Sequence, residues 1–314
     1  MNFRYVFEFL QDRRAAGMDT VLVTVCAVEG SSMRNPGTIM GVAEDGSYAG
    51  SLSGGCIEAA VVAEAVDTLR SGEPRIVRFG AGSRYIDIKL PCGGGLDLHF
   101  QPLGASDLAE RCLQSIADRE PFSMALAQEG ASHLSDWRAP SYDASAGEAV
   151  FGHWPEPLLA IVGHGAGVEA LERMASTMGC ISRVYTPDER VVDALRNGPT
   201  EVIGLERTSE TGLLQSDPWT AFVFLFHDHD WEIDLMARAI ELPHFYLGAM
   251  GGRKAHAVRS EALRARGISE EQLSAMKAPI GVFHSSRDPQ TLALSTLAEI
   301  IRTYQDTDFG KALG

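Results

Sequence analysis

The fold is decided by the stretch LLAIVGHGAG, which runs from Leu158 to Gly167. Its first five residues are apolar, and a short apolar run of this kind is typical of a strand buried on both faces of a parallel sheet. Glycines follow the run, and a helix is predicted over residues 168–178. A strand, a glycine loop and a helix in this order predict that a doubly wound α/β sheet begins at Leu158.

The residues after this stretch repeat the same order of elements. Further strands are predicted from apolar runs at residues 182–186, 219–226 and 244–250. Helices are predicted over residues 252–266, 269–276 and 289–305, the second of them from a capping pattern at its start. We therefore predict a C-terminal Rossmann-like domain over residues 158–314.

The residues before it have a different pattern. A helix at 3–16, strands at 20–28 and 38–43 and a helix at 57–71 predict an N-terminal mixed α/β domain over residues 1–105. Residues 106–157 are predicted as a connecting segment, with a helix at 106–118 and a strand near 124–128. Residues 129–157 mix Ser, Pro, Gly and Trp, and are predicted as a hairpin-like segment and the interdomain linker. The predicted fold class is α/β, with the mixed domain followed by a Rossmann-like doubly wound parallel sheet domain.

Charge and cysteine content exclude several classes of protein. The 314 residues include 27 Lys and Arg against 42 Asp and Glu, a net charge of −15, whereas a nucleic-acid partner calls for a basic protein. Charges interrupt the apolar N-terminal segment, and no apolar run approaches the roughly 20 residues that span a bilayer. We expect a cytoplasmic protein without a membrane partner. The five cysteines form no CxxC pair, which argues against a disulfide framework or structural zinc.

Two of the cysteines adjoin glycine runs, Ser53-Gly54-Gly55-Cys56 and Cys92-Gly93-Gly94-Gly95. Glycine lets a ligand approach the backbone closely. Cys56 also precedes a predicted helix, whose dipole favours the thiolate. The alternative is that both thiols are structural, because cysteine is among the most buried residue types.

The glycines after the strand at 158–162 resemble a dinucleotide fingerprint. Gly165, Gly167 and Ala170 fit the G-x-G-x-x-A form, and Gly163 offers another register. The helix start that follows could hold a phosphate on its N–H groups. A dinucleotide site also needs an acidic residue at the end of the second strand. Here the first acidic residue, Asp188, comes only after the strand and after a proline. The motif therefore indicates the fold more strongly than it indicates bound NAD(P), which stays an alternative ligand.

Two other motifs follow predicted strands. His227 and His229 could bind a metal or transfer a proton, or the segment could simply cap the next helix through Asp230. Further along, Gly251 and Arg253 belong to a glycine-rich, basic helix start that could hold a phosphate, or that could be only a tight turn.

Taken in order, these motifs resemble the xanthine dehydrogenase accessory factor family (XdhC/CoxI type). The resemblance covers nearly the whole chain apart from residues 106–157. The segments that carry it are Gly30-Ser31-Ser32-Met33-Arg34, Asp45-Gly46, Ser53-Gly54-Gly55-Cys56-Ile57-Glu58, Cys92-Gly93-Gly94, the glycine loop at Gly163, His227-Asp228-His229, residues 248–254 and Ala278-Pro279-Ile280-Gly281.

The resemblance implies a chaperone of the molybdenum cofactor (molybdopterin) and favours this role over an enzyme. Such proteins bind the cofactor, protect it while a cysteine desulfurase helps to add a terminal sulfur, and deliver it to a xanthine dehydrogenase-type molybdenum hydroxylase. A homo-oligomer is also expected. The cofactor-binding residues that we expect are Ser31, Ser32, Arg34, Gly54, Gly55, Cys56, Cys92, Gly93, Gly94, Gly163, Gly165, Gly167, Gly251 and Arg253.

The chain departs from the family pattern at four places. Met33 stands where proline is usual, Ala278 stands where cysteine is usual, and Thr186-Pro187 replaces an acidic pair. After Gly281, residues 282–286 replace a stretch that usually contains glycine. One rival hypothesis is an NAD(P)-dependent oxidoreductase that uses the Rossmann-like domain, with His227 or His229 as acid or base. Another is a scaffold whose acidic surface docks partners without holding a ligand.

Overall fold

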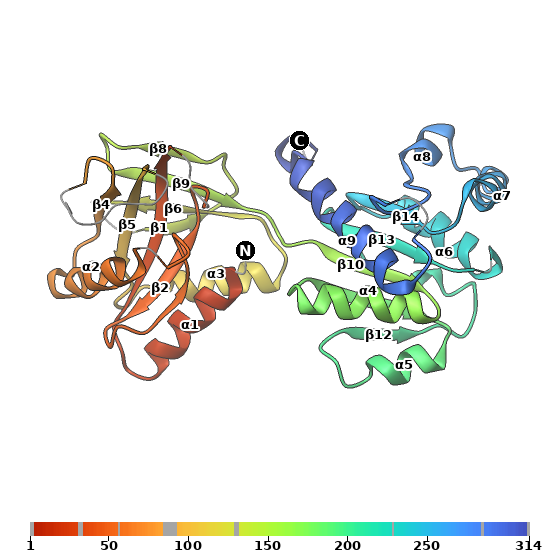
Figure 1. Cartoon of the computed structure of the whole chain (residues 1–314), viewed down its shortest axis with the longest axis horizontal. Helices are drawn as coiled ribbons and strands as arrows, with labels where there is room; N and C mark the ends of the chain where they lie inside the picture. The colour runs from red at the N-terminus through yellow and green to blue at the C-terminus, as the bar shows by residue number, and fades with distance from the viewer. Residues whose placement is uncertain are drawn as a thin grey trace. The chain divides into compact units, whose positions relative to one another are not determined.

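The computed structural model describes residues 3–30, 34–55, 57–83, 93–128, 132–227, 229–283 and 286–312. The chain divides into two compact units, Met1–Pro155 and Glu156–Gly314. Each unit has its own sheets and its own apolar cores (Figure 1). Among the described residues, no helix is both long and apolar enough to cross a membrane.

The first unit is built around an antiparallel sheet with the strand order β3-β2-β1-β5-β4. Strand β1 alternates between the two faces. Val21 and Val23 pack on one face with helix α2, and Leu22 packs on the other with helix α1. The elements are α1 (Phe3–Ala15), β1 (Thr20–Glu29), β2 (Ile39–Ala43), β3 (Tyr48–Gly50), α2 (Glu58–Ser71), β4 (Arg75–Gly80) and β5 (Gly95–Pro102).

A second antiparallel sheet, with the order β7-β6-β9-β8, belongs to the same unit. Residues 106–157, expected as a connecting segment with a helix, a strand and a hairpin-like part, form α3 and this sheet as part of the first unit. The reason is burial, since Phe122, Met124 and Phe151 share a core with α1 and β1. The elements are α3 (Leu108–Ala117), β6 (Phe122–Ala127), β7 (His133–Ser135), β8 (Ser141–Asp143) and β9 (Glu148–His153).

The second unit has a parallel sheet with the order β12-β11-β10-β13-β14, which confirms the predicted Rossmann-like fold. Every residue of β10 and β13 is buried, as strands covered on both faces require. The strands are β10 (Leu158–Gly163), β11 (Ile181–Thr186), β12 (Glu201–Gly204), β13 (Thr220–Leu225) and β14 (Tyr246–Ala249).

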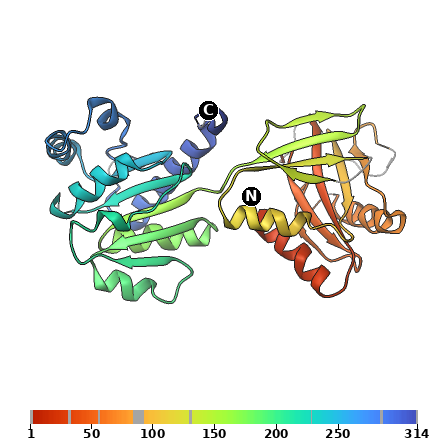
Figure 2. The same ribbon diagram turned by 180° about the vertical axis from the view of Figure 1, so that it is seen from behind.

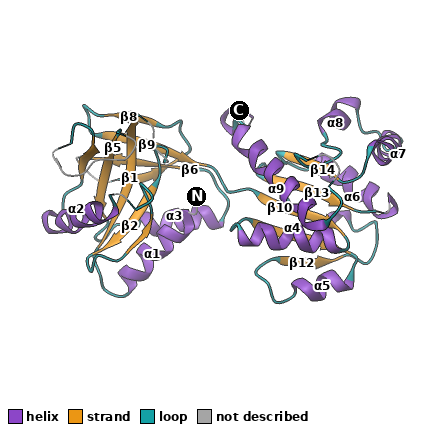
Figure 3. Ribbon diagram, viewed as in Figure 1, coloured by secondary structure: helices purple, strands orange, loops and turns teal. Residues whose placement is uncertain are grey.

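Helices cover both faces of this parallel sheet (Figure 2; Figure 3). Leu159 and Ile161 of β10 pack with α4 and α9, whereas Ala160 and Val162 pack with α6, α7 and α8. The helices are α4 (Ala166–Thr177), α5 (Glu189–Leu195), the 3-10 helix η1 (Thr211–Leu213), α6 (His229–Glu241), α7 (Arg253–Arg264), α8 (Glu270–Ala275), α9 (Pro289–Asp306) and α10 (Phe309–Ala312).

The strand order reverses between β10 and β13. The chain passes from β10 outward to β11 and β12, and then returns to β13 on the other side of β10. At such a switch point the loops after the two strands diverge and leave a crevice for ligands. In this unit those loops begin at His164 and at Phe226.

Candidate functional site

The loop between β10 and α4 contains glycines for two different reasons. A Cβ on Gly163 would lie 2.6 Å from the carbonyl oxygen of Leu225, so this glycine permits close packing of β10 on β13. Gly165 has a φ of +77° with no atom within 4 Å of a Cβ, so its backbone conformation requires glycine. It directly precedes α4, whose first N–H groups it leaves without a side-chain cap.

A cavity of about 670 Å³, here called cavity A, opens at this helix start. It brings together five of the predicted site residues, namely Gly165, Gly167, His227, Gly251 and Arg253, whereas Gly163 does not line it. The other lining residues are His164, Ala166, Leu225, Met250, Gly252, Pro279, Ile280, Phe283, Ser286, Arg287, Asp288, Pro289 and Leu292.

Cavity A has a local excess of positive charge. The guanidinium groups of Arg253 and Arg287 are exposed, and neither forms an ion pair with another described residue. Helix α7 begins after Gly252, which has no side chain to cap it. Asp288 also lines the cavity, but its carboxylate accepts the Thr291 N–H at 2.8 Å as the cap of α9. Uncapped helix starts and free guanidinium groups favour an anionic ligand.

A buried ion pair holds the loop between β14 and α7 in place. Arg259 of α7 has no exposed surface, and its Nη2 atom lies 2.8 Å from Oε1 of Glu232 on α6. The same nitrogen donates to the carbonyl oxygen of Met250 at 2.8 Å. Gly251 has a φ of +113°, and a Cβ there would lie 2.9 Å from that of Ala255. Arg259 was not predicted as a site residue, because one arginine on a helix face gives no signal of burial.

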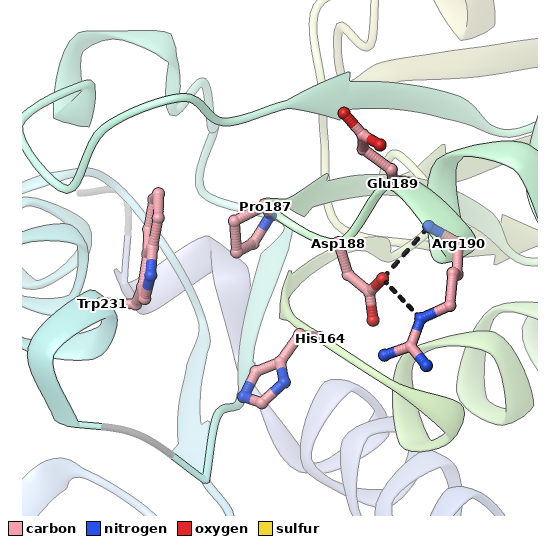
Figure 4. A pocket seen from close by; sticks show the side chains of 6 residues that line it. All are labelled: His164, Pro187, Asp188, Glu189, Arg190 and Trp231. Carbon is pink, nitrogen blue, oxygen red and sulfur yellow. Dashed lines mark hydrogen bonds and ion pairs between the residues drawn. The ribbon is translucent and has the colours of Figure 1, made fainter.

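A second cavity of about 530 Å³, here called cavity B, lies beside the end of β11 (Figure 4). Asp188 lines it, although Asp188 lies two residues beyond the end of β11, after Pro187. Its Oδ1 atom accepts the Arg190 N–H at 3.1 Å and Nε–H at 3.3 Å, which caps α5. Burial raises the pKa of Asp188, but the hydrogen bonds from Arg190 outweigh it and the pKa is lowered. The lining residues are His164, Pro187, Asp188, Glu189, Arg190 and Trp231.

His164 lines both cavities. The backbone N–H of His227 donates to its Nε2 atom at 3.3 Å, so a neutral His164 ring carries its hydrogen on Nδ1. The two imidazole rings are 5.8 Å apart and nearly perpendicular. The predicted metal pair of His227 and His229 stays a prediction, since the side chain of His229 is outside the described part. Within that part, no group of three His, Cys, Asp or Glu could hold a metal.

In the first unit, pairing of β1 with β5 brings two predicted glycine loops together. Glu29, the last residue of β1, pairs with Gly95, the first residue of β5. A Cβ on Gly94 would overlap the Glu29 carbonyl oxygen, and one on Gly30 would lie 3.3 Å from the Cα of Gly94. The loop that starts at Gly30 and the loop that ends at Gly94 therefore meet backbone to backbone. Gly93 precedes this contact, and Arg34 is half-buried beyond the first loop.

The third glycine loop is organised by Glu58, whose carboxylate is buried at the start of α2. It accepts the N–H groups of Ser53 and Gly55 at 2.9 Å each, and the N–H of Ile57 at 3.2 Å. It also accepts the Leu52 N–H and the hydroxyl groups of Ser51 and Ser53. Burial raises the pKa of Glu58, but these hydrogen bonds outweigh it and hold the pKa at about 2.

This network changes the expected role of Gly54 and Gly55. The Gly55 N–H is bound to Glu58, and the Gly54 N–H donates to the hydroxyl of Ser51 at 3.0 Å. The loop therefore uses these two N–H groups, together with that of Ile57 after Cys56, to fix its own shape. Cys56 itself lies outside the described residues, as do three other predicted site residues, Ser31, Ser32 and Cys92.

Two other cysteines are poor candidates for a reactive thiol. Cys26 and Cys112 are buried, and burial raises the pKa of both, to about 12 for Cys26. Both are therefore protonated at neutral pH. Cys180 is half-buried, and burial raises its pKa as well.

The fold defines this chain as a two-unit α/β protein whose second unit is of the Rossmann type. Residues 159–300 match the family model of the XdhC Rossmann domain, and residues 13–80 match that of the XdhC and CoxI family. The chain is 31% identical to the molybdenum cofactor insertion chaperone PaoD of Escherichia coli K12, over 97% of this chain and 90% of that protein. It therefore belongs to the XdhC and CoxI family.

The chain is also similar to two more distant proteins. The uncharacterised protein YqeB of Escherichia coli K12 is 24% identical over 90% of this chain, which spans 43% of YqeB. A crystal structure described as a xanthine dehydrogenase from Bacillus halodurans matches with a TM-score of 0.77 at 19% identity, over 96% of each chain. At that identity the match shows the fold alone.

Proposed function

We propose that this protein binds the molybdenum cofactor and assists its sulfuration and its insertion into a xanthine dehydrogenase-type molybdenum hydroxylase. The observation that carries the proposal is the 31% identity with the insertion chaperone of Escherichia coli, which extends over nearly the full length of both chains. A relation of this extent includes both units, and not only the common Rossmann fold.

The chemistry of the cofactor suits the predicted residues of the first unit. The cofactor combines a phosphate, a hydrogen-bonding pterin and a molybdenum held by sulfur. A thiolate is a soft ligand, so Cys56 and Cys92 are assigned to the molybdenum end. Arg34 is assigned to the phosphate, because a guanidinium group binds phosphate oxygens in a bidentate manner.

The described backbone supports a single site in the first unit. Ser31 and Ser32 follow Gly30 in the sequence, and Cys92 precedes Gly93 and Gly94. The contact between Gly30 and Gly94 means that both loops extend from one place at the end of the β1–β5 pair. A hydroxyl group from the first loop and a thiol from the second could then contact one ligand. Gly54 and Gly55 would contribute by shaping the loop before Cys56.

Partners follow from the proposed role. Sulfuration needs a sulfur donor, for which a cysteine desulfurase is proposed, and insertion needs contact with the hydroxylase. A homo-oligomer is also proposed.

The test is cofactor retention. We would purify the full chain without oxygen from a molybdenum-replete host, and measure molybdenum by elemental analysis and pterin by mass spectrometry. Wild-type protein should carry both, and the double variant Cys56→Ala/Cys92→Ala should lose most of the molybdenum. Cys180→Ala is the matched control and should retain it. Wild-type retention in the double variant would end the role of the thiols, and a wild type without pterin would contradict the function.

One observation favours the rival oxidoreductase. Asp188 lines cavity B, close to where a nicotinamide dinucleotide would place a ribose. Tight NAD(P) binding by calorimetry, together with no affinity for molybdopterin, would support that activity, with His227 or His229 as the acid or base.

A further inference from the structure

An arginine of the first unit lies beside the two glycine loops that meet at the end of β1 and β5. Arg78 of β4 is opposite Asp97 of β5 in the sheet register, and its Nη1 atom donates to Oδ1 of Asp97 at 3.0 Å. Its Nη2 atom is ion-paired with the carboxylate of Glu29, the last residue of β1. Its Nε–H donates to the carbonyl oxygen of Ala81 at 2.7 Å. One guanidinium group therefore joins β1, β5 and the residues after β4.

Two glycines make room for this side chain. A Cβ on Gly95 would lie 2.7 Å from Nη2 of Arg78, and one on Gly82 would lie 3.3 Å from Nε. The Ala81 N–H donates to the carbonyl oxygen of Gly94 at 2.9 Å. The guanidinium group therefore packs against both described ends of the loop between β4 and β5.

The second sheet of the first unit also contacts Asp97. The hydroxyl of Tyr142 on β8 is hydrogen-bonded to the Asp97 carboxylate. Burial and this carboxylate raise the pKa of Tyr142 to about 12, so the hydroxyl is protonated at neutral pH and donates. Strand β1 is irregular at the same place, with a register shift between Val25 and Ala27, and Ala27 pairs with Asp97. Irregularities of this kind often lie next to sites, where they change the direction of a side chain.

These contacts favour a role in holding the loops over a role in binding an anion. An isolated ion pair at the surface contributes little to stability, whereas several charges in one network contribute more. Arg78 has three acceptors on three segments of chain, and two of them are carboxylates. Its positive charge is therefore already balanced by Glu29 and Asp97.

We propose that Arg78 is a positioning residue for the cofactor site, where it fixes the spacing of the two glycine loops. In the sequence these loops carry Ser31, Ser32 and Cys92, which are predicted to bind the cofactor. Groups that bind a ligand have to be held to within about 0.5 Å, and residues outside the site provide that support. The inference rests on the function proposed above.

The strand that carries Arg78 also provides its matched control. Arg75 is at the other end of β4, where it forms ion pairs with Glu64 and Asp67 of α2 at 3.1 Å and 3.0 Å. We would purify Arg78→Met and Arg75→Met without oxygen from a molybdenum-replete host. Both should melt at a lower temperature than wild type, because each leaves two carboxylates without their cation. Only Arg78→Met should retain less than about one-fifth of the wild-type molybdenum, because only its loops lose their spacing.

Two further variants separate positioning from direct binding. Glu29→Gln releases part of the Arg78 guanidinium group, so a direct bond from Arg78 to the cofactor phosphate would raise molybdenum retention above that of wild type. Positioning predicts that retention stays equal or falls. Arg78→Lys keeps the charge but loses the planar set of donors, so it should recover little of the molybdenum that Arg78→Met loses.

Hydrogen exchange on cofactor-free protein tests the loops without the cofactor. Amides in residues 80–83 and 93–96 should exchange at least about tenfold faster in Arg78→Met than in wild type, because the opening of these segments becomes easier. The same amides should exchange at the wild-type rate in Arg75→Met.

Three results would overturn the inference. They are equal molybdenum retention in Arg78→Met and Arg75→Met, retention above wild type in Glu29→Gln, and unchanged exchange in Arg78→Met. The two proposals fail separately. If wild-type protein carried no pterin, the proposed function would be contradicted, and hydrogen exchange would still decide whether Arg78 holds the loops.

Discussion

Arg259 and Glu232 form a fully buried ion pair, with 2.8 Å between Nη2 and Oε1. The pair joins α7 to α6, and the same guanidinium group holds the carbonyl oxygen of Met250 in the wall of cavity A. A charge placed so deeply is costly unless its partner is present. The position of the loop before α7 therefore depends on the buried ion pair between Arg259 and Glu232.

Arg259→Met should lower the free energy of unfolding by about 3–5 kcal/mol, because it leaves the Glu232 carboxylate buried without its cation. The double variant Arg259→Met/Glu232→Met should recover a large part of that loss. Urea denaturation measures both. A loss below about 1 kcal/mol in the single variant would show that the pair does not hold the helices together.

Glu58→Gln should destabilise the first unit by about 2 kcal/mol at pH 7, because an amide accepts fewer of the hydrogen bonds that the carboxylate accepts. The pKa of Glu58 is held at about 2, below its ordinary 4.5. Its contribution is therefore complete above pH 4.5 and is lost as the pH falls toward 2. The difference in the free energy of unfolding between wild type and variant, measured by denaturation, should therefore decrease from pH 4.5 to pH 2.

Glu73→Gln is the control for that measurement, because Glu73 is exposed. It should leave stability almost unchanged at both pH values. A constant gap between wild type and Glu58→Gln from pH 5 to pH 2 would contradict the assigned role of the carboxylate.

Gly94→Ala should cost stability, on the order of 2 kcal/mol or more, because the new methyl group meets the Glu29 carbonyl oxygen and forces β1 and β5 apart. Gly204→Ala is the matched control, since a Cβ there has no atom within 4 Å. Thermal unfolding compares the two. Equal melting temperatures would show that the two loops do not meet as described.

His153→Phe should remove a pH dependence of stability in the first unit. His153 is buried between Phe3 and Phe122, and burial lowers its pKa from 6.5 to about 4. The unfolded chain binds a proton first as the pH falls, so wild type should lose stability from pH 6.5 down to 4. The variant keeps an aromatic ring packed between Phe3 and Phe122, and should lose less stability over the same pH range. Parallel pH profiles of wild type and His153→Phe would contradict this.

The sequence predicted the parts of the fold that have strong local signals. The apolar run at 158–162 became β10, and the capping pattern at Ser269 became a capping box in which Ser269 and Gln272 bond reciprocally. Such signals come from residues close together in the chain, so they can be recognised before any tertiary contact is known.

The elements that escaped prediction have weak local signals. β12 is a four-residue edge strand with no fully buried residue, and β7 and β8 have three residues each. β7 and β8 pair with β6 and β9, their neighbours in the chain, and only a hairpin-like segment was predicted there. β12 pairs with β11 across the intervening helix α5, which no local pattern reveals. The role of Asp188 escaped for the same reason, since only the fold shows that the residue after Pro187 still reaches the cavity.

The carboxylate of Glu58 takes all its bonds from donors no more than seven residues away. The hydrogen bonds that shape that loop are thus encoded locally, in residues 51–58. We expect residues 51–58, grafted ahead of a helix in an unrelated scaffold, to fold into the same turn around the Glu58 carboxylate.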